Sequence, residues 1–265
     1  MCNGRNHTHH LPLNAITGIE ELIRSIALQI HQGKLTPDTI PNNLIQLIAS
    51  ELMKGVDIGA ELSTGSISAA QAQLMRENVF VFSGFKSHAQ LREISAMLTD
   101  SSGNPRPFSQ FVQDALQVNK TYNVNYLEAE YNHAIASGQM AGNWQHAMDN
   151  ADVAPYLTYQ TAEDDHVRPA HAALNKISKP VSDPFWDVYY PPNGWNCRCD
   201  AAEDFEPPAD AAQPDYGVIQ DIPPMFRNNV GKTGVIFPDT HPYFDIQNPA
   251  LATKITEQAK GLAAQ

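Results

Sequence analysis

The chain has 265 residues, 42% of them hydrophobic, so it is long enough to fold around its own core without disulfide crosslinks. The 29 acidic and 17 basic residues give a formal net charge of −12, which disfavours direct binding to free nucleic acid. Three cysteines are too few for a disulfide framework and favour a reducing compartment. No stretch approaches the ~20 consecutive apolar residues of a membrane-spanning helix, so we expect no membrane contact.

The N-terminal segment, residues 1–13, is polar and rich in histidine, and we expect it to be a disordered tail. It lacks the apolar core of a signal peptide. Its imidazoles (His7, His9 and His10) could chelate adventitious metal.

Residues 14–65 are expected to form an N-terminal helical region. Isoleucines and leucines recur at helical spacing from 19 to 30, with Thr17 as a possible N-cap and Gly33 as a stop. A second helix should begin near Pro41 and end before Gly55, and a third piece spans 66–77.

The middle of the chain reads as further helices separated by turns. An apolar stretch at 79–82 should end at Ser83-Gly84, and the polar segment 99–107 reads as a turn. Helices are predicted over 87–98, 108–118 and 124–148, the last being the longest candidate. Gly138 and Gly142 lie four residues apart inside it, which permits a close helix crossing or a kink.

The pattern changes after residue 152. Strands are predicted at 156–161 and 197–201, which we expect to pair, with a short helix at 171–177 between them. Residues 203–214 read as an acidic linker, and a helix at 248–262 should close the chain. The fold class is therefore α+β: a mostly helical N-terminal part with a small β-containing motif region towards the C-terminus.

The stretch 156–199 carries the residue types that suggest chemistry. On a strand, Cys197 and Cys199 would point to the same side, and two thiolates with His171 could bind a soft metal such as zinc. His166 or Asp165 could supply a fourth ligand. The alternative is that both cysteines pack as small apolar side chains on the inner face of a strand.

Two further interpretations concern charged residues in this stretch. Arg168 should contact an acidic side chain, either Asp165 three residues earlier or one in the segment 183–187, as a structural ion pair rather than a catalytic group. A hydrolase could be assembled from His171 as base, a cysteine as nucleophile and Asp165 as orienting group, although no nucleophile elbow is present.

The same stretch resembles the core motif of the phage Mu protein F family of head-morphogenesis proteins, also called minor capsid or minor head proteins. The resemblance rests on the runs TAEDD-x-VR-x-x-H-x-x-L from Thr161, DPFWD from Asp183 and YPPNGW-x-CRC from Tyr190. With the upstream helices it covers roughly residues 66–202, leaving 203–265 as an acidic linker and C-terminal extension. Where many relatives have a glycine after the motif leucine, this chain has Asn175-Lys176.

The resemblance implies a minor virion protein acting in head morphogenesis, associated with the portal vertex and with DNA packaging or delivery. Its partners would be phage portal and capsid proteins, with packaged DNA an indirect partner at most. It would reside in the virion, and in the host cytoplasm during assembly. The expected structural motif residues are Asp164, Asp165, Arg168, His171, Asp183, Trp186, Asp187, Asn193, Trp195 and Arg198.

This interpretation favours a structural protein over an enzyme. The alternative function is a toxin-like, metal-dependent hydrolase or nuclease that uses His171, Cys197 and Cys199. Zinc is the one cofactor that the residues suggest.

Overall fold

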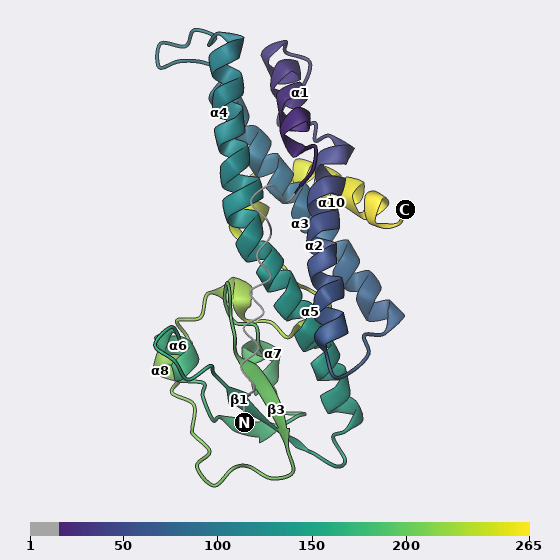
Figure 1. Ribbon diagram of the computed structural model, residues 1–265, viewed down its shortest axis with the longest axis vertical. Helices are drawn as coiled ribbons and strands as arrows, with labels where there is room; N and C mark the ends of the chain where they lie inside the picture. Colours follow the sequence, from purple (N-terminus) through teal and green to yellow (C-terminus); the bar gives the residue numbers. More distant parts are fainter. Residues whose placement is uncertain (1–15) are drawn as a thin grey trace.

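The computed structural model describes residues 16–265, so the expected tail at 1–13 lies outside the described residues. A long helical body occupies one end of the molecule and a smaller part with the β-sheet occupies the other (Figure 1). The helices of the body are α1 (Ile19–His31), α2 (Asn42–Leu62), α3 (Ala69–Ala96), α4 (Phe108–Lys120), α5 (Leu127–Asp149) and α10 (Pro249–Ala263). The α+β class is confirmed.

A six-residue π-helix, η1 (Thr121–Tyr126), joins α4 to α5, so that the three elements run as one continuous helical rod (Figure 1). A π-helix is rare and introduces extra residues into the helical turn, which rotates the faces of the helices on either side. The sequence predicted separate helices at 108–118 and 124–148 and did not predict this junction.

Helix α2 does not end before Gly55 as expected but continues to Leu62. The reason is its close crossing with α5. A Cβ atom on Gly59 would lie 2.0 Å from the carbonyl oxygen of Ile135, and one on Gly138 would lie 2.3 Å from that of Val56. Small residues on both helices therefore let the two backbones touch, and the expected close crossing at Gly138 is confirmed.

The break predicted at Ser83-Gly84 is also wrong, because α3 runs unbroken from Ala69 to Ala96 and is longer than α5. The Ser83 hydroxyl donates to the Val79 carbonyl at 2.8 Å, which satisfies this polar group inside the helix. Gly84 leaves room for Ile255 of α10, whose side chain would lie 3.0 Å from an added Cβ. Helix α3 is buried among α2, α4 and α10.

The small sheet has three antiparallel strands in the order β2 (Ser178–Pro180), β1 (Tyr156–Gln160), β3 (Asp200–Asp204). β1 pairs with β3 in the register Tyr156↔Asp204 to Gln160↔Asp200. The predicted pairing of the two segments is confirmed, but β3 begins three residues later than expected. Cys197 and Cys199 therefore lie in the loop before the strand and not on it.

The predicted helix at 171–177 is shorter and earlier, since α6 covers only Pro169–Ala172 and turns follow it. Lys176 takes a φ of +64°, a left-handed conformation that glycine adopts without strain. Lys176 therefore lies in a turn that requires positive φ.

The C-terminal quarter folds back over the helical body. The Phe237 ring stacks on Phe82 of α3 with centroids 3.8 Å apart, and Phe244 packs against Phe85 at 4.6 Å. The predicted C-terminal helix is confirmed as α10, with Asn248 as its N-cap. The short elements in this part and in the sheet region are α7 (Phe185–Tyr189), α8 (Tyr216–Ile219), η2 (Pro224–Phe226), α9 (Val230–Thr233) and η3 (Pro242–Phe244).

Candidate functional site

The three predicted metal ligands come together although the cysteines do not lie on a strand. His171, on α6, is buried, and its Nδ1 lies 3.7 Å from Cys197 Sγ and 3.5 Å from Cys199 Sγ. The three ligand atoms all lie within 4.8 Å of one another. The cluster can therefore hold a metal ion or a shared proton.

The loop before β3 places the two thiols by turning sharply. Asn196 has a φ of +53°, and the Cys197 amide donates to the Gly194 carbonyl at 3.2 Å. A cis peptide bond joins Pro191 to Pro192 earlier in the same loop. The turn brings both sulfur atoms to the same side, a result that the sequence predicted for a different reason, the alternation of a strand.

Asn193 organises the interior of this loop. It is fully buried, accepts a hydrogen bond from the Tyr159 hydroxyl at 3.1 Å and donates to the carbonyls of Tyr190 and Phe226. Its own carbonyl accepts from His171 Nε2 at 3.2 Å. The loop is thus tied to β1, to the C-terminal segment and to α6 by one side chain and one carbonyl.

The two thiols are electrostatically unequal. The hydrogen bond between them, followed by the neighbouring His171, lowers the pKa of Cys197 well below its ordinary value. The same hydrogen bond and burial raise the pKa of Cys199.

The expectation that Arg168 contacts an acidic side chain is wrong. Within residues 16–265, no carboxylate lies within ion-pair distance of its guanidinium, which donates instead to the backbone carbonyl of Trp195 at 2.6 Å. The motif's exposed ion pair is made by Arg198, which donates two hydrogen bonds to Asp164 at 2.6 and 2.7 Å. This guanidinium lowers the pKa of Asp164 to about 2.

Asp165 and His166 stay away from the cluster. Both side chains are exposed, and they lie 3.7 Å from each other. Because His171 Nε2 faces a backbone carbonyl, Asp165 does not orient that imidazole as the hydrolase interpretation required. The fourth-ligand role suggested for these two residues is equally unsupported by their positions.

The contacts of the DPFWD segment (residues 183–187) stabilise the fold around α7. The Asp183 carboxylate accepts from the Phe185 amide at 2.8 Å at the start of that helix. Trp186 is fully buried and donates from Nε1 to the Pro180 carbonyl at 3.1 Å. Asp187 forms an ion pair with Lys232 of α9, which connects the motif to the C-terminal segment.

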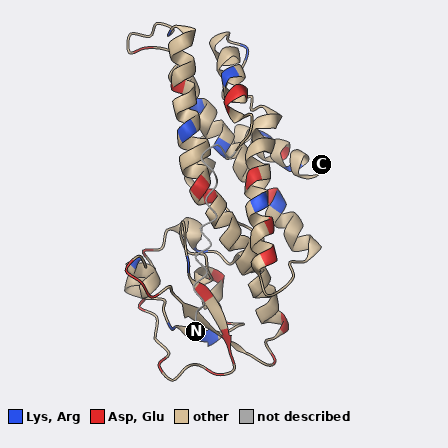
Figure 2. Ribbon diagram, viewed as in Figure 1, with Lys and Arg blue, Asp and Glu red and all other residues tan. Residues whose placement is uncertain are grey.

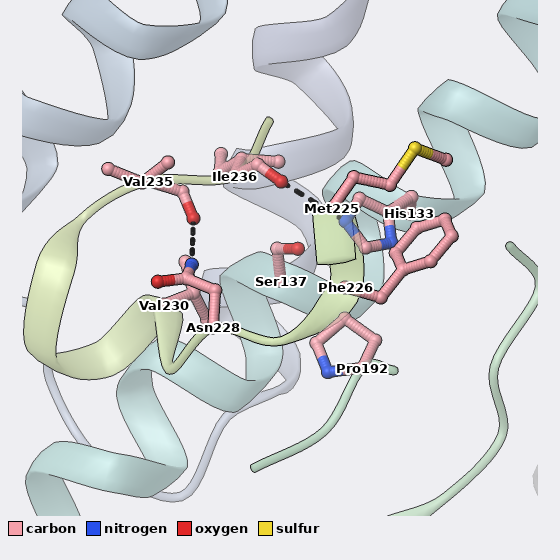
Figure 3. Close-up of a pocket in the computed structure, with 9 residues that line it drawn as sticks. All are labelled: His133, Ser137, Pro192, Met225, Phe226, Asn228, Val230, Val235 and Ile236. Atoms are coloured by element: carbon pink, nitrogen blue, oxygen red, sulfur yellow. Dashed lines mark hydrogen bonds between the residues drawn. The ribbon is translucent and has the colours of Figure 1, made fainter. Parts of the chain in front are cut away.

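Trp195 packs in an aromatic group beside the cluster. Its ring lies 5.3 Å from that of His133 on α5 and 5.1 Å from that of Phe226. A small cavity lined by His133, Phe226, Asn228 and Ile236, among others, has room for about one water molecule (Figure 3). His133 Nε2 lies 3.2 Å from the Ile236 carbonyl, and burial lowers its pKa to about 4.

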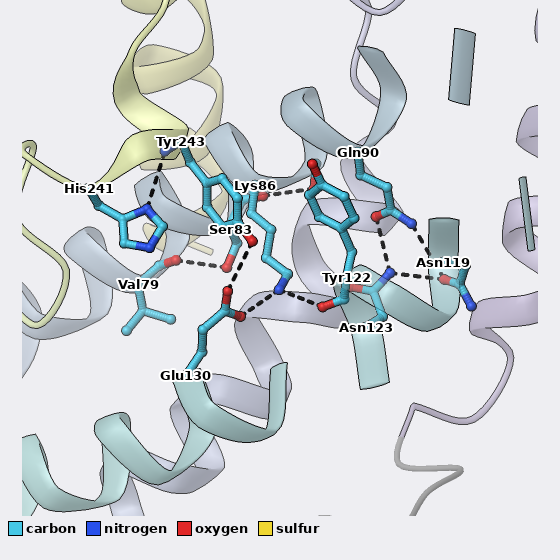
Figure 4. Close-up of polar contacts among 11 residues, drawn as sticks. Val79, Ser83, Lys86, Gln90, Asn119, Tyr122, Asn123, Glu130, His241 and Tyr243 are labelled. Carbon is cyan, nitrogen blue, oxygen red and sulfur yellow. Dashed lines mark hydrogen bonds and ion pairs between the residues drawn. The ribbon is translucent and has the colours of Figure 1, made fainter. Parts of the chain in front are cut away.

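A buried ion pair in the helical body was not predicted from the sequence. Lys86 Nζ of α3 lies 2.5 Å from Glu130 Oε2 of α5 and 2.7 Å from the Tyr122 carbonyl in the π-helix (Figure 4). The Tyr243 hydroxyl donates to the other Glu130 oxygen at 3.3 Å. The sequence did contain one signal for this pair. Lys86 follows Val79 by seven residues and Phe82 by four, so its charge lies on the same apolar helix face as these two residues.

Comparison with known proteins finds similarity to phage and prophage proteins over part of this chain. Residues 89–202 match the family model described as "Phage Mu protein F like protein". The protein named "Putative capsid assembly protein F" of Escherichia phage Mu is 42% identical over 73 residues, which are 28% of this chain and 17% of that protein. The "Mu-like prophage FluMu F protein" of Haemophilus influenzae is 39% identical over 59 residues, 22% of this chain and 14% of that protein.

The matched segments thus span less than a fifth of the length of either relative. No solved structure matches the chain. The family match begins inside α3 and ends inside β3, so it contains α4, η1, α5, the cysteine–histidine cluster and most of the sheet.

Proposed function

Because residues 89–202 belong to the phage Mu protein F-like family, we propose that this chain acts in phage head morphogenesis as a minor structural component of the virion. The observation that carries this proposal is the family match, supported by a relative whose name describes capsid assembly. The motif residues support it physically, because most of them hold the loop, α6 and α7 together rather than line an open cleft.

The finer proposal is that the chain acts at the portal vertex, with portal and capsid proteins as partners and with a role in DNA packaging or delivery. The net charge of −12 favours protein partners over direct contact with DNA. Lysines and arginines are scattered over several elements and do not gather on one face in the view of Figure 2. Packaged DNA would therefore be an indirect partner.

The proposed location is the virion, with the host cytoplasm as the place of assembly. Among the helices of residues 16–265, none combines the length and the hydropathy needed to cross a bilayer. This finding is compatible with a head component.

Co-expression with the portal and major capsid proteins of a Mu-like phage tests the proposal directly. We expect the chain to co-purify with one of them through size-exclusion chromatography, and purified heads to contain it in a few copies by quantitative mass spectrometry. Deleting its gene should leave defective heads that a plasmid copy restores. Normal infectious particles without the chain would refute the proposal.

The competing function, a metal-dependent hydrolase or nuclease, is measured on the same preparation. The purified full chain is incubated with single-stranded DNA, double-stranded DNA and denatured protein in the presence of zinc or manganese. We expect no cleavage. Cleavage that disappears in both Cys197→Ser and Cys199→Ser would support the hydrolase instead.

A further inference from the structure

We propose that His171 Nδ1, Cys197 Sγ and Cys199 Sγ bind one zinc-class divalent cation, which fastens α6 to the loop that begins β3. The proposal is independent of the role in head morphogenesis. It starts from the arrangement of one imidazole nitrogen and two sulfur atoms around a common point.

The hydrogen bond at Nε2 leaves the Nδ1 atom of a neutral His171 ring with one lone pair for two sulfur atoms. Nε2 lies 3.2 Å from the Asn193 carbonyl oxygen, which can only accept, so Nε2 carries the proton of the neutral ring. Nδ1 then has a single lone pair directed at Cys197 and Cys199. One thiol can donate to it and the second cannot, whereas a metal ion at the common point satisfies all three atoms.

The distances fit a tetrahedral metal site. With metal–sulfur bonds of about 2.3 Å and metal–nitrogen bonds of about 2.05 Å, a tetrahedral angle places nitrogen and sulfur about 3.6 Å apart. The observed separations between Nδ1 and the two sulfurs are 3.7 and 3.5 Å. Both nitrogen–sulfur separations therefore already match those of a tetrahedral metal site.

The surroundings also fit a bound cation. Two thiolates and a neutral imidazole balance the double charge of the ion, so that the partly buried site becomes neutral. The hydrogen bond from Nε2 to a backbone carbonyl is the usual outer-sphere support of a metal-bound histidine. Asn193 is held in turn by the Tyr159 hydroxyl, so the ring orientation is fixed before metal arrives.

The fourth position would be taken by water. Within residues 16–265, no fourth histidine, cysteine or carboxylate joins the cluster. The guanidinium of Arg168 and the His171 ring both approach Gly194, where an added Cβ would lie 3.1 Å from Arg168 Nη1 and 3.3 Å from the ring. Among residues 16–265, no carboxylate or second imidazole joins the cluster to act as a general base for that water, so we assign the ion a structural role.

Metal analysis of the full chain, purified under reducing conditions without chelators, tests the site. We expect about one zinc per chain by mass spectrometry of the metal content. Replacement of zinc by Co²⁺ should give thiolate-to-cobalt charge-transfer absorption together with the intense visible bands of a tetrahedral site. Both signals should disappear in Cys197→Ser/Cys199→Ser and persist in His171→Cys, which replaces the imidazole by a third thiolate ligand.

Matched controls separate the cluster from the rest of the chain. Cys2→Ser removes the third cysteine, and His7→Ala/His9→Ala/His10→Ala removes the N-terminal imidazoles; neither should lose the metal. Circular dichroism reports whether each variant is folded. Zinc content near zero in the reduced wild-type chain after incubation with zinc, or metal that remains in the folded double cysteine variant, would overturn the proposal.

Discussion

Replacing the buried lysine of the helical body should destabilise the protein severely. Lys86 and Glu130 are 0% and 3% exposed and lie 2.5 Å apart, so neither charge has water as a substitute partner. Lys86→Met leaves the Glu130 carboxylate without its cation and the Tyr122 carbonyl without its donor. Removing one partner of a buried ion pair costs about 3–5 kcal/mol, and we expect a loss in that range.

The paired substitution Lys86→Met/Glu130→Met distinguishes the ion pair from simple loss of packing. Replacing both charges by apolar groups of similar volume is often neutral or stabilising. The double variant should therefore be several kcal/mol more stable than the sum of the two single variants predicts. Burial lowers the pKa of Lys86 and raises that of Glu130, so each single variant removes a partner from a group that is already poorly solvated.

Urea denaturation followed by circular dichroism measures all four proteins of this cycle. A loss below about 1 kcal/mol in Lys86→Met would refute the reasoning, because a value that small is typical of an exposed pair. Strict additivity in the double variant would also refute it, since the two side chains would then not be coupled.

Three further changes have definite expected outcomes. Gly59→Ala should lose about 1–3 kcal/mol in urea denaturation, because its Cβ would lie 2.0 Å from the Ile135 carbonyl, whereas Gly261→Ala, with no atom within 4 Å, should be neutral or stabilising. Asn193→Ala should cost about 3 kcal/mol, since it leaves two buried carbonyls and one hydroxyl without partners; a loss under 1 kcal/mol would contradict that role. Burial lowers the pKa of His133 to about 4, so the unfolded chain binds this proton and the folded chain does not between about pH 4 and 6.5. The stability that this residue contributes is therefore complete above about pH 6.5 and is lost as the pH decreases, by about 2 kcal/mol at pH 5. A His133→Gln variant with an unchanged pH dependence of stability would disprove this expectation.

The helical elements were largely determined by local sequence. Apolar spacing predicted α1, α4 and α10, because each buries one face along a regular stripe. Glycine and serine inside the longer helices misled the prediction. Their effect depends on what approaches them, and Gly55 and Gly84 admit a neighbouring helix rather than end their own.

The site shows the same division. Residue types were enough to select His171, Cys197 and Cys199 as candidate metal ligands, because few side chains bind soft metals and these three lie in one motif. The predicted geometry was a strand, whereas a turn with positive φ at Asn196 orients the thiols. The Arg168 contact was predicted wrongly because charge complementarity does not reveal which groups the fold brings together: Arg168 donates to the Trp195 carbonyl, and Arg198 pairs with Asp164.

The sequence by itself determined the α+β class, the family resemblance and the candidate metal-binding residues. The tertiary structure decided the continuous α3, the π-helical junction, the buried Lys86–Glu130 pair and the tautomer of His171. Each of these depends on contacts between segments far apart in the chain: Lys86 meets Glu130 forty-four residues later, and His171 meets Asn193 across a loop. Periodicity and spacing describe only neighbours along the chain, so they cannot report which distant groups fold against each other.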